Sequence, residues 1–443
     1  MADRRPFTSA DPLAHVERRS FWQATMPSLP DRRGRQLPDS ADVVVIGGGY
    51  TGLSAARQLA RAGAAVTLLE AETLGWGAST RNGGIVHPGY KWGPRTLIAR
   101  YGEETGRALW AETLEGYSFV RRLIEDEGID CAFEERGHLE LAFAPSHMAE
   151  LEEAKAGLAL VGVESALIPR ARLREEIGTD AYHGALAFDG SGGLHPGRYL
   201  AGLVDAAARA GTDLHEGVRA RAVRPQADGR VVVETDRGAI IARDVVVGTN
   251  GYTDGAVPAL RRRIIPIGSY IIVTEVLAED LATELAPTGR VFFDTKNFLY
   301  YWRLTPDRRM LFGGRASFRP TSVERTAAIL HRGLIEVHPQ LRQSRIEYAW
   351  GGNVGFTFDR MPHVGRIGRV TYAMGYCGTG VAMSTYLGTR VGEWLGGGPA
   401  PALARLRFPL VPAPYEGRAW FLPFVGEWYR LQDRLATRSG PKA

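Results

Sequence analysis

The sequence predicts an α/β fold that combines a parallel, helix-flanked sheet with a second, mixed and largely antiparallel sheet. Two observations carry this prediction. A buried strand at 42–46, a glycine-rich turn, a helix and a second strand ending at Glu70 follow one another within about thirty residues, which is the size of a βαβ unit. Farther along, strand-like runs at 271–275, 298–303 and 310–313 are separated by short turns, as in antiparallel sheets.

The first βαβ unit follows from residue type and spacing. Residues 42–46 read Asp-Val-Val-Val-Ile, a run typical of a strand buried on both faces. Apolar residues at helical spacing over 53–62, followed by Gly63, predict a helix that ends at this glycine. Residues 65–69 predict the second buried strand. The remaining elements are expected in this order: mostly helix over 93–160, a helix at 196–211, strands at 229–234 and 242–247, a turn at 248–251, a strand at 372–374 and a helix at 381–395.

Length and composition exclude several classes of protein. A chain of 443 residues allows two or three domains, and 44% hydrophobic with 23% charged residues is a globular composition. No apolar stretch is long enough to span a bilayer, so no stable membrane insertion is expected. The Arg4-Arg5 pair is followed by no apolar region, so we expect no export signal and a cytoplasmic location.

The net charge and the spacing of the cysteines exclude several kinds of partner and site. The net charge of +5 is small and the basic residues are scattered, so no nucleic-acid partner is expected. Cys131 and Cys377 lack metal-ligand spacing and any CxxC pattern, so neither a metal site nor a dithiol centre is expected. The chain has only four lysines, a skew that we attribute to coding bias. Any role that needs a lysine therefore has few candidates.

Three glycines between the first strand and helix have separate physical purposes. Gly47 permits a tight turn, Gly49 lets the backbone approach a pyrophosphate, and Gly52 lets the helix pack against the strand. The helix N-terminus offers free N–H groups to phosphates. Glu70 ends the second strand, where a carboxylate can accept hydrogen bonds from a ribose. This combination predicts a dinucleotide-binding unit.

The segment at 75–84 favours FAD over NAD, because it follows the second strand at once and leaves little open crevice for a mobile cofactor. Here the sequence resembles the D-amino-acid-oxidase-like flavoenzymes, which include sarcosine and glycine oxidases; residues 77–84, 244–250 and 375–381 carry the resemblance. Within that family it is most similar to gamma-glutamylputrescine oxidoreductases. The segments that carry this closer resemblance are 48–54, 81–84, 191–193 with 195–196, 311–314, 360–362 and 428–435.

The resemblance implies a Rossmann-type FAD-binding domain with an inserted α+β substrate domain. The FAD-binding domain is expected over 38–92, 150–258 and 346–400, the substrate domain over 93–149 and 259–345, and a tail over 401–443 that packs on the body. The implied cofactor-binding residues are Gly47, Gly49, Tyr50, Thr51, Gly52, Glu70, Ala71, Gly77, Ala78, Ser79, Arg81, Asn82, Gly83, Gly84, Ala220, Thr249, Asn250, Gly351, Gly378, Thr379, Gly380 and Val381.

The implied reaction is oxidation of a small-molecule amine at its carbon–nitrogen bond. The resulting imine would hydrolyse to an aldehyde or keto product, and electrons would pass through FAD to oxygen with formation of hydrogen peroxide. Two alternatives stay open: a dehydrogenase of an amine or N-methyl amino acid that uses a quinone or another acceptor, and an FAD-dependent structural or assembly protein without turnover. The sequence does not indicate the oligomeric state.

Five residues of the flavin segment and the inserted sheet are candidates for contact with the substrate or for catalysis. His87 follows the implied flavin segment and is expected either to face the substrate or to bond to backbone as an ordinary loop histidine. Strand alternation sends Tyr300 and Trp302 to one face and Tyr301 to the other, so only one set can line the pocket, and we favour Tyr301. Arg303 faces as Tyr301 does and would either pair with a substrate carboxylate or be a solvated strand arginine.

The resemblance also bears on flavin attachment. Some relatives link the flavin through a histidine where Arg81 stands, or through a cysteine near Asn353 and Val354, and this chain has neither. Non-covalent FAD is therefore expected. Cys377, in the implied flavin loop beside the substrate, is expected to be a small packing residue.

The positions of the lysines bear on whether oxygen can reoxidise the flavin. Sarcosine oxidases place a lysine near the flavin in the strand that matches 309–313, where this chain has Leu311. Lys91 and Lys296 are the plausible substitutes, and Lys296 is taken as a catalytic candidate.

The aromatic and arginine-rich segment 420–435 predicts an amphipathic helix, which we expect to dock on protein rather than on a membrane surface.

Overall fold

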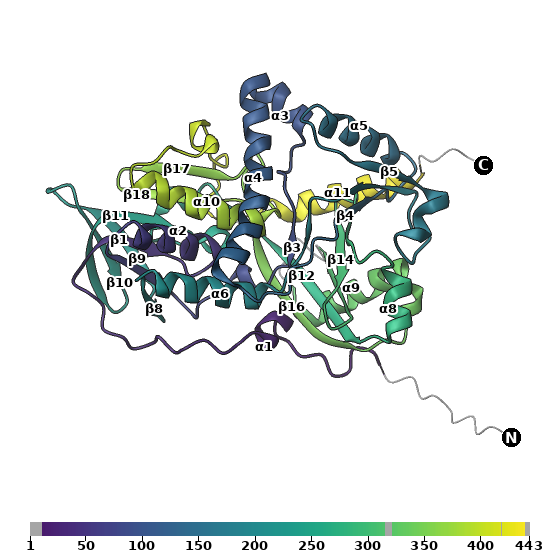
Figure 1. Ribbon diagram of the computed structural model, residues 1–443, viewed down its shortest axis with the longest axis horizontal. Helices are drawn as coiled ribbons and strands as arrows, with labels where there is room; N and C mark the ends of the chain where they lie inside the picture. Colours follow the sequence, from purple (N-terminus) through teal and green to yellow (C-terminus); the bar gives the residue numbers. More distant parts are fainter. Residues whose placement is uncertain (1–10, 315–320, 418, 439–443) are drawn as a thin grey trace.

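The computed structural model describes residues 11–314, 321–417 and 419–438, so the Arg4-Arg5 pair lies outside the described residues. Within these residues the chain forms two eight-stranded sheets that lie side by side, the first at the left of Figure 1 and the second at the right. The helices are α1 (Phe21–Thr25), α2 (Tyr50–Arg61), α3 (Pro94–Tyr101), α4 (Glu103–Glu127), α5 (His147–Ala159), α6 (Pro196–Arg209), α7 (Pro258–Arg261), α8 (Glu279–Leu285), α9 (Val323–Val337), α10 (Gly380–Leu395) and α11 (Leu422–Arg438).

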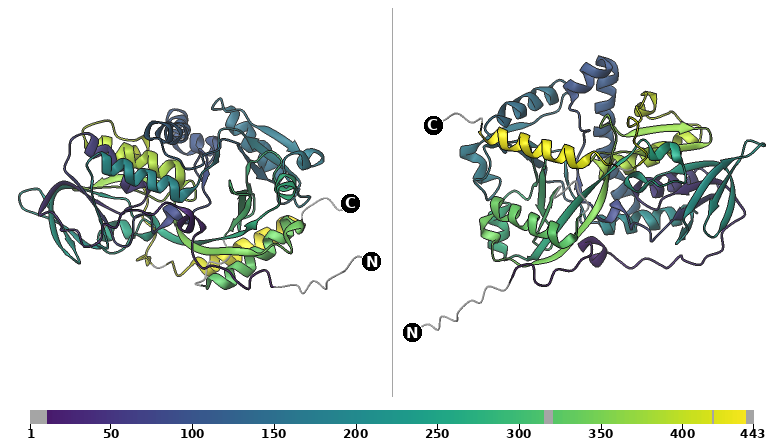
Figure 2. Two further views of the ribbon diagram at one scale, coloured as in Figure 1. Left: turned by 60° about the horizontal axis from the view of Figure 1, so that its bottom comes forward. Right: turned by 180° about the vertical axis from the view of Figure 1, so that it is seen from behind.

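The first sheet is the predicted parallel sheet. Its strands are β1 (Ser40–Ile46), β2 (Val66–Glu70), β8 (Asp213–Glu216), β9 (Ala220–Pro225), β10 (Val231–Thr235), β11 (Gly238–Val247), β17 (His363–Ile367) and β18 (Val370–Met374). They run in the order β17-β18-β11-β1-β2-β8, parallel except for β17, and β9 and β10 extend from β11 as an antiparallel meander. Helix α2 packs between α6 and α10, and the three helices lie together in the left view of Figure 2.

The second sheet is mixed and mostly antiparallel. Its strands are β4 (His138–Leu141), β5 (Ala166–Pro169), β6 (Gly184–Phe188), β12 (Ile265–Val276), β13 (Val291–Asp294), β14 (Tyr300–Leu304), β15 (Arg309–Gly314) and β16 (Ile346–Phe356). Their order is β16-β12-β15-β14-β13-β4-β6-β5. Helix α9 packs on β12, β15 and β16, and one face of the sheet is buried in a core under it. A two-stranded ribbon, β3 (Ile85–Val86) with β7 (Gly192–Gly193), completes the strands described.

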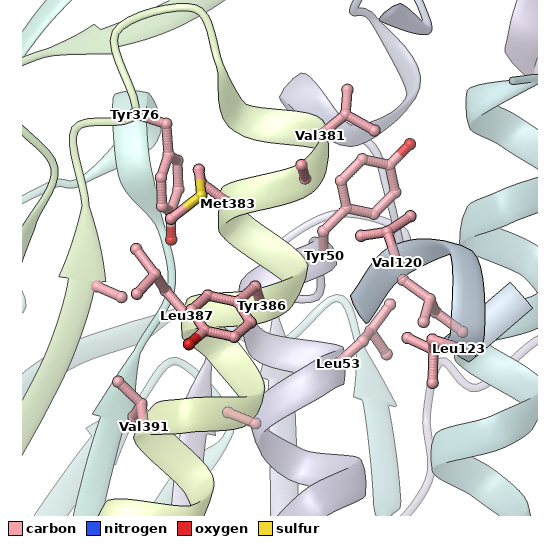
Figure 3. Close-up of a cluster of buried hydrophobic side chains, with 14 of the residues drawn as sticks. Tyr50, Leu53, Val120, Leu123, Tyr376, Val381, Met383, Tyr386, Leu387 and Val391 are labelled. Carbon is pink, nitrogen blue, oxygen red and sulfur yellow. The ribbon is translucent and has the colours of Figure 1, made fainter. Parts of the chain in front are cut away.

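The expected domain boundaries need correction. Strands β5 and β6 join the second sheet through β4, although 150–258 was assigned to the FAD-binding domain. Conversely, α4 packs on α10 of the FAD-binding domain, although 93–149 was assigned to the substrate domain. Figure 3 shows Val120 and Leu123 of α4 beside Leu53 of α2 in the same buried cluster. Chain order does not reveal these exchanges, because they depend on pairing between distant segments.

The C-terminal segment lies against the body. Leu422 of α11 is buried in a cluster with Phe356, and Val425 and Tyr429 pack against the same cluster. The Asp433 carboxylate accepts hydrogen bonds from the Asn297 backbone N–H at 3.0 Å and from its side-chain amide at 2.9 Å. No helix in the described part of the chain is long and apolar enough to cross a membrane.

Candidate functional site

The carboxyl ends of β1, β2 and β11 surround a cavity, which we call the strand-end cavity. Parallel strands end at the same edge of a sheet, so the loops that follow them meet there. The cavity is lined by the first βα turn, the end of β2, the 75–82 segment, the turn after β11 and the start of α10. Its predicted members are Gly47, Gly49, Tyr50, Thr51, Glu70, Ala71, Gly77, Ala78, Ser79, Asn82, Ala220, Thr249, Asn250, Gly378, Gly380 and Val381.

The three motif glycines lie where their expected purposes require. Gly47 has φ +108°, which favours glycine. A Cβ on Gly52 would lie 1.9 Å from the Gly47 carbonyl oxygen, so Gly52 serves helix–strand packing and lines neither cavity described here. The N-cap residue of α2, Gly49, has no side chain, and the first N–H of the helix, that of Tyr50, donates to the Ser79 hydroxyl at 3.0 Å. The N–H groups that follow in the first turn can still bind an anion.

Glu70 lies at the end of β2 and also shapes the turn. Its carboxylate accepts hydrogen bonds from the backbone N–H groups of Gly48 at 2.8 Å and Glu72 at 2.9 Å. Burial raises the pKa of Glu70, and these bonds oppose that rise. Because a carboxylate has about four acceptor positions, a ribose hydroxyl can still bind there.

A second cavity lies on the face of the second sheet opposite α9, and we call it the sheet-face cavity. One cross-strand row forms part of its wall: Leu186 on β6, Glu140 on β4, Phe293 on β13 and Tyr301 on β14. The intervening residues Leu139 and Leu141 are buried in the core on the other face. The Tyr301 hydroxyl is 3.1 Å from the Ser269 hydroxyl.

The two cavities meet, and seven residues line both. They are Ala78, Asn82, Asn353, Val354, Cys377, Gly378 and Val381. The strand-end cavity has the glycine turn and the helix N-terminus that fit a pyrophosphate, with Glu70 beside them for a ribose. A dinucleotide held there would extend to this junction, so the residues present fit FAD with its ring system between the cavities.

The loop at the junction is fixed by donors from distant segments. Successive backbone carbonyls accept hydrogen bonds: Thr80 from the Ser20 hydroxyl at 2.5 Å, Arg81 from Trp350 Nε1 at 3.0 Å, Asn82 from Trp22 Nε1 at 2.7 Å, and Gly83 from Arg303 Nε at 3.0 Å. Sequence reasoning missed Ser20, Trp22 and Trp350, because no local pattern marks them. Together these donors hold the loop in one conformation.

Arg303 therefore needs correction as a substrate-binding candidate. Its guanidinium donates to the carbonyls of Gly83 and Leu194, and its side chain lines neither cavity. Burial lowers the pKa of Arg303 to about 10. The residue is a buried anchor for the junction loop.

The expectation for Tyr300, Trp302 and Lys296 is also corrected. Trp302 is fully buried in the core under the second sheet, and Tyr300 packs on Phe312 with ring centroids 4.8 Å apart. Lys296 Nζ lies 3.0 Å from the Asp294 carboxylate and 3.6 Å from the Tyr300 ring centroid. None of the three lines either cavity. Alternation turns the Tyr300 and Trp302 face of β14 away from the junction, and Lys296, in the turn before β14, is held by Asp294.

Other predicted residues reach the site in a different way or not at all. Tyr50 lines the strand-end cavity, but its hydroxyl donates to the Pro196 carbonyl at 3.1 Å in the core. Gly84, with φ +69°, and Gly351 line neither cavity. Arg81, Gly83 and Thr379 line the sheet-face cavity.

His87 lines the sheet-face cavity as a neutral ring. Its Nδ1 lies 2.9 Å from the Pro88 carbonyl oxygen, and because a carbonyl only accepts, Nδ1 carries the proton. Burial lowers the pKa of His87 to about 4. The ring thus bonds to backbone as an ordinary loop histidine does, and its Nε2 keeps a lone pair that can accept a hydrogen bond in the cavity.

Cys377 contributes mainly its backbone to the junction. Its Sγ donates to the Gly375 carbonyl oxygen at 3.1 Å, and burial raises the pKa of this thiol. The thiol is free and buried, as is that of Cys131. In the described part of the chain no group of three or more His, Cys, Asp or Glu side chains could hold a metal ion.

Comparison with known proteins identifies the class that this fold and site define. Residues 42–394 match the family model described as DAO, FAD dependent oxidoreductase. The chain is 35% identical over 402 residues to gamma-glutamylputrescine oxidoreductase of Escherichia coli (strain K12), covering 89% of this chain and 93% of the relative. It is 34% identical over 389 residues to the probable oxidoreductase OrdL of Haemophilus influenzae, covering 86% and 88%. The chain therefore belongs to the DAO family of FAD-dependent oxidoreductases.

Solved structures support the same fold. The crystal structure of glycine oxidase from Geobacillus kaustophilus aligns with a TM-score of 0.69 at 21% identity, covering 86% of this chain and 99% of that one. L-proline dehydrogenase from P. horikoshii aligns with a TM-score of 0.67 at 20% identity, covering 82% and 96%. One of these proteins is named an oxidase and the other a dehydrogenase, so the fold does not decide the electron acceptor.

Proposed function

We propose that this FAD-dependent oxidoreductase is an amine oxidase that converts a small-molecule amine to an imine and passes the electrons to oxygen. The observation that carries the proposal is the junction between the cavities. A pocket walled by aromatic and aliphatic side chains opens where the ring of a bound FAD would lie. The similarity to gamma-glutamylputrescine oxidoreductase supports an amine as the donor.

The residues of the sheet-face cavity favour an uncharged amine at the reacting end. An amine must lose its proton before its lone pair can assist hydride loss, and an apolar wall disfavours the ammonium form. Neutral His87 can accept a hydrogen bond from the amine N–H, which orients the reacting group. When FAD is bound it supplies the hydride-accepting chemistry, and the protein supplies position and electrostatics.

The C-terminal flavin loop has a separate role in this proposal. Gly378 and Thr379 precede α10, which begins at Gly380 and whose N-cap, Thr379, makes no side-chain cap among the described residues. Backbone N–H groups there can stabilise negative charge that develops on the cofactor ring during reduction.

Anaerobic mixing of the holoenzyme with a panel of primary and secondary amines tests the proposal. We expect the FAD absorbance to bleach with at least one amine, and air to restore it with formation of hydrogen peroxide. Recovery only on addition of a quinone would establish the dehydrogenase alternative instead. Failure of every amine to bleach the FAD would favour a protein without turnover.

Lys91 replaces Lys296 as the candidate for speeding the reaction with oxygen. It lines the sheet-face cavity, and its Cε lies 3.9 Å from the position that a Cβ on Gly378 would take. A nearby ammonium would stabilise negative charge as oxygen is reduced. In Lys91→Met we expect oxygen to reoxidise the holoenzyme about a hundredfold more slowly, with the rate of anaerobic reduction by substrate little changed.

The matched control is Lys155→Met, which removes an exposed lysine on α5 outside both cavities. Stopped-flow absorbance separates the two half-reactions. Equal reoxidation rates in wild type and Lys91→Met would exclude this role for Lys91.

A further inference from the structure

Among the described residues that line the sheet-face cavity, Glu140 provides the one carboxylate. Glu140 is on β4, where alternation turns His138 and Glu140 to the cavity and Leu139 and Leu141 to the core. Its side chain is half-buried. Among the residues that the structure describes, burial and the charges of Lys91 and Glu150 shift the pKa of Glu140, and no hydrogen bond does, so its oxygens keep their acceptor capacity.

Glu140 lies away from the junction with the strand-end cavity. Tyr301 packs on the junction loop, since a Cβ on Gly83 would lie 2.8 Å from Tyr301 Cε2. Glu140 and Tyr301 both pair with Phe293 of β13, so two strand spacings, about 10 Å, separate them. Phe293, Leu186 and Leu158 provide apolar surface beside Glu140. A ligand that reaches from the junction to Glu140 must therefore contain an aliphatic chain of several carbons.

The other ionisable groups near Glu140 do not replace a bound cation. Burial lowers the pKa values of His87 and His138, so both rings are uncharged at neutral pH. The charge of Lys91 lowers the pKa of Glu140, which opposes the larger effect of burial. Burial raises the pKa of Glu140, and a cation bound there would oppose that rise.

We propose that Glu140 binds a positively charged amine at the far end of the substrate, so that the preferred substrates are aliphatic diamines or amines with a distal cationic group. The two ends of the cavity then select different protonation states. The apolar junction accepts the neutral reacting amine, and Glu140 holds the charged one, which fixes the direction in which the substrate enters. This inference rests on the proposed amine oxidase activity and deepens it by naming the substrate class.

The test compares diaminopentane with pentylamine, which differ only in the distal amine. In wild-type holoenzyme we expect kcat/KM to be at least about tenfold higher for the diamine, as for a hydrogen bond between charged groups. In Glu140→Gln this preference should disappear, mainly through a higher KM for the diamine, so that the ratio of the two kcat/KM values falls to about one. The amide conserves shape, and the FAD content of the variant confirms its fold.

The matched control is Glu150→Gln, which removes an exposed carboxylate that acts on Glu140 but lines neither cavity. A diamine preference that is absent in wild type, retained in Glu140→Gln, or equally lost in Glu150→Gln would overturn the assignment, even with pentylamine oxidised normally. If neither amine bleaches the flavin, the proposed function fails separately. Calorimetric titration with diaminopentane then decides the subsite: about tenfold weaker binding to Glu140→Gln supports it, and equal binding overturns it.

Discussion

Gly52→Ala is expected to destroy most FAD binding, although it adds a single methyl group. The new Cβ would lie 1.9 Å from the Gly47 carbonyl oxygen and 3.3 Å from Val45 Cγ1, so α2 must move away from β1. That movement displaces the N–H groups that are placed for the pyrophosphate. We expect well under one FAD per chain and a loss of about 1–3 kcal/mol in the free energy of unfolding.

The measurement is FAD released by acid precipitation, together with denaturant unfolding. Gly255→Ala is the matched control, because a Cβ there meets no atom within 4 Å, and it should change stability by less than about 0.5 kcal/mol. Normal FAD content in Gly52→Ala would contradict the assigned packing role. The same assay addresses attachment: we propose non-covalent FAD, and a wild-type precipitate that stays yellow would refute it.

Acid is expected to destabilise the protein well above the pH at which surface carboxylates protonate. His338 is fully buried against Trp302, and burial lowers its pKa from 6.5 to about 4. Since the folded pKa is below the unfolded one, the unfolded chain binds more protons between these values. The contribution of His338 is therefore complete above pH 6.5 and falls by about 3 kcal/mol as the pH approaches 4.

Denaturant unfolding of the holoenzyme from pH 7 to pH 4, with FAD in excess, measures this effect. Buried carboxyls such as Asp294, whose pKa is raised by burial, change the stability in the opposite direction. The test is therefore the difference in the free energy of unfolding between wild type and variant at each pH. His338→Gln should be less stable at pH 7 but lose less stability on acidification. Parallel pH profiles for wild type and variant would show that His338 does not titrate in this range.

Local sequence features determined the first βαβ unit and the cofactor class. The strand at 42–46, the glycine turn and the strand ending at Glu70 are confirmed as β1, the turn before α2, and β2. The helix begins at Tyr50, three residues before the first apolar residue expected in it, because the last residues of the glycine-rich segment form its first helical turn. Such elements are predictable because their hydrophobic pattern and glycines are contiguous.

The short strands of the second sheet were harder to predict. Strand β4 has only four residues and lies within a stretch read as mostly helical, so alternation alone gave too little signal. Its pairing with β13 and β6, which are distant in the chain, turns Glu140 to the cavity. Trp22 was also missed, because its indole donates to the Asn82 carbonyl, which is distant in the chain.

The sequence by itself thus determined an FAD-binding α/β protein and the face of β14 on which Tyr301 lies, and it proposed a residue set for the cofactor. Only the tertiary structure decided which polar residues line the sheet-face cavity. In that structure Arg303 donates to a backbone carbonyl of the junction loop and Lys296 forms an ion pair with Asp294. Lys91 and Glu140 line the sheet-face cavity. The physical reason is that a motif acts through its own backbone, whereas a pocket is formed by side chains whose neighbours depend on strand pairing across the whole chain.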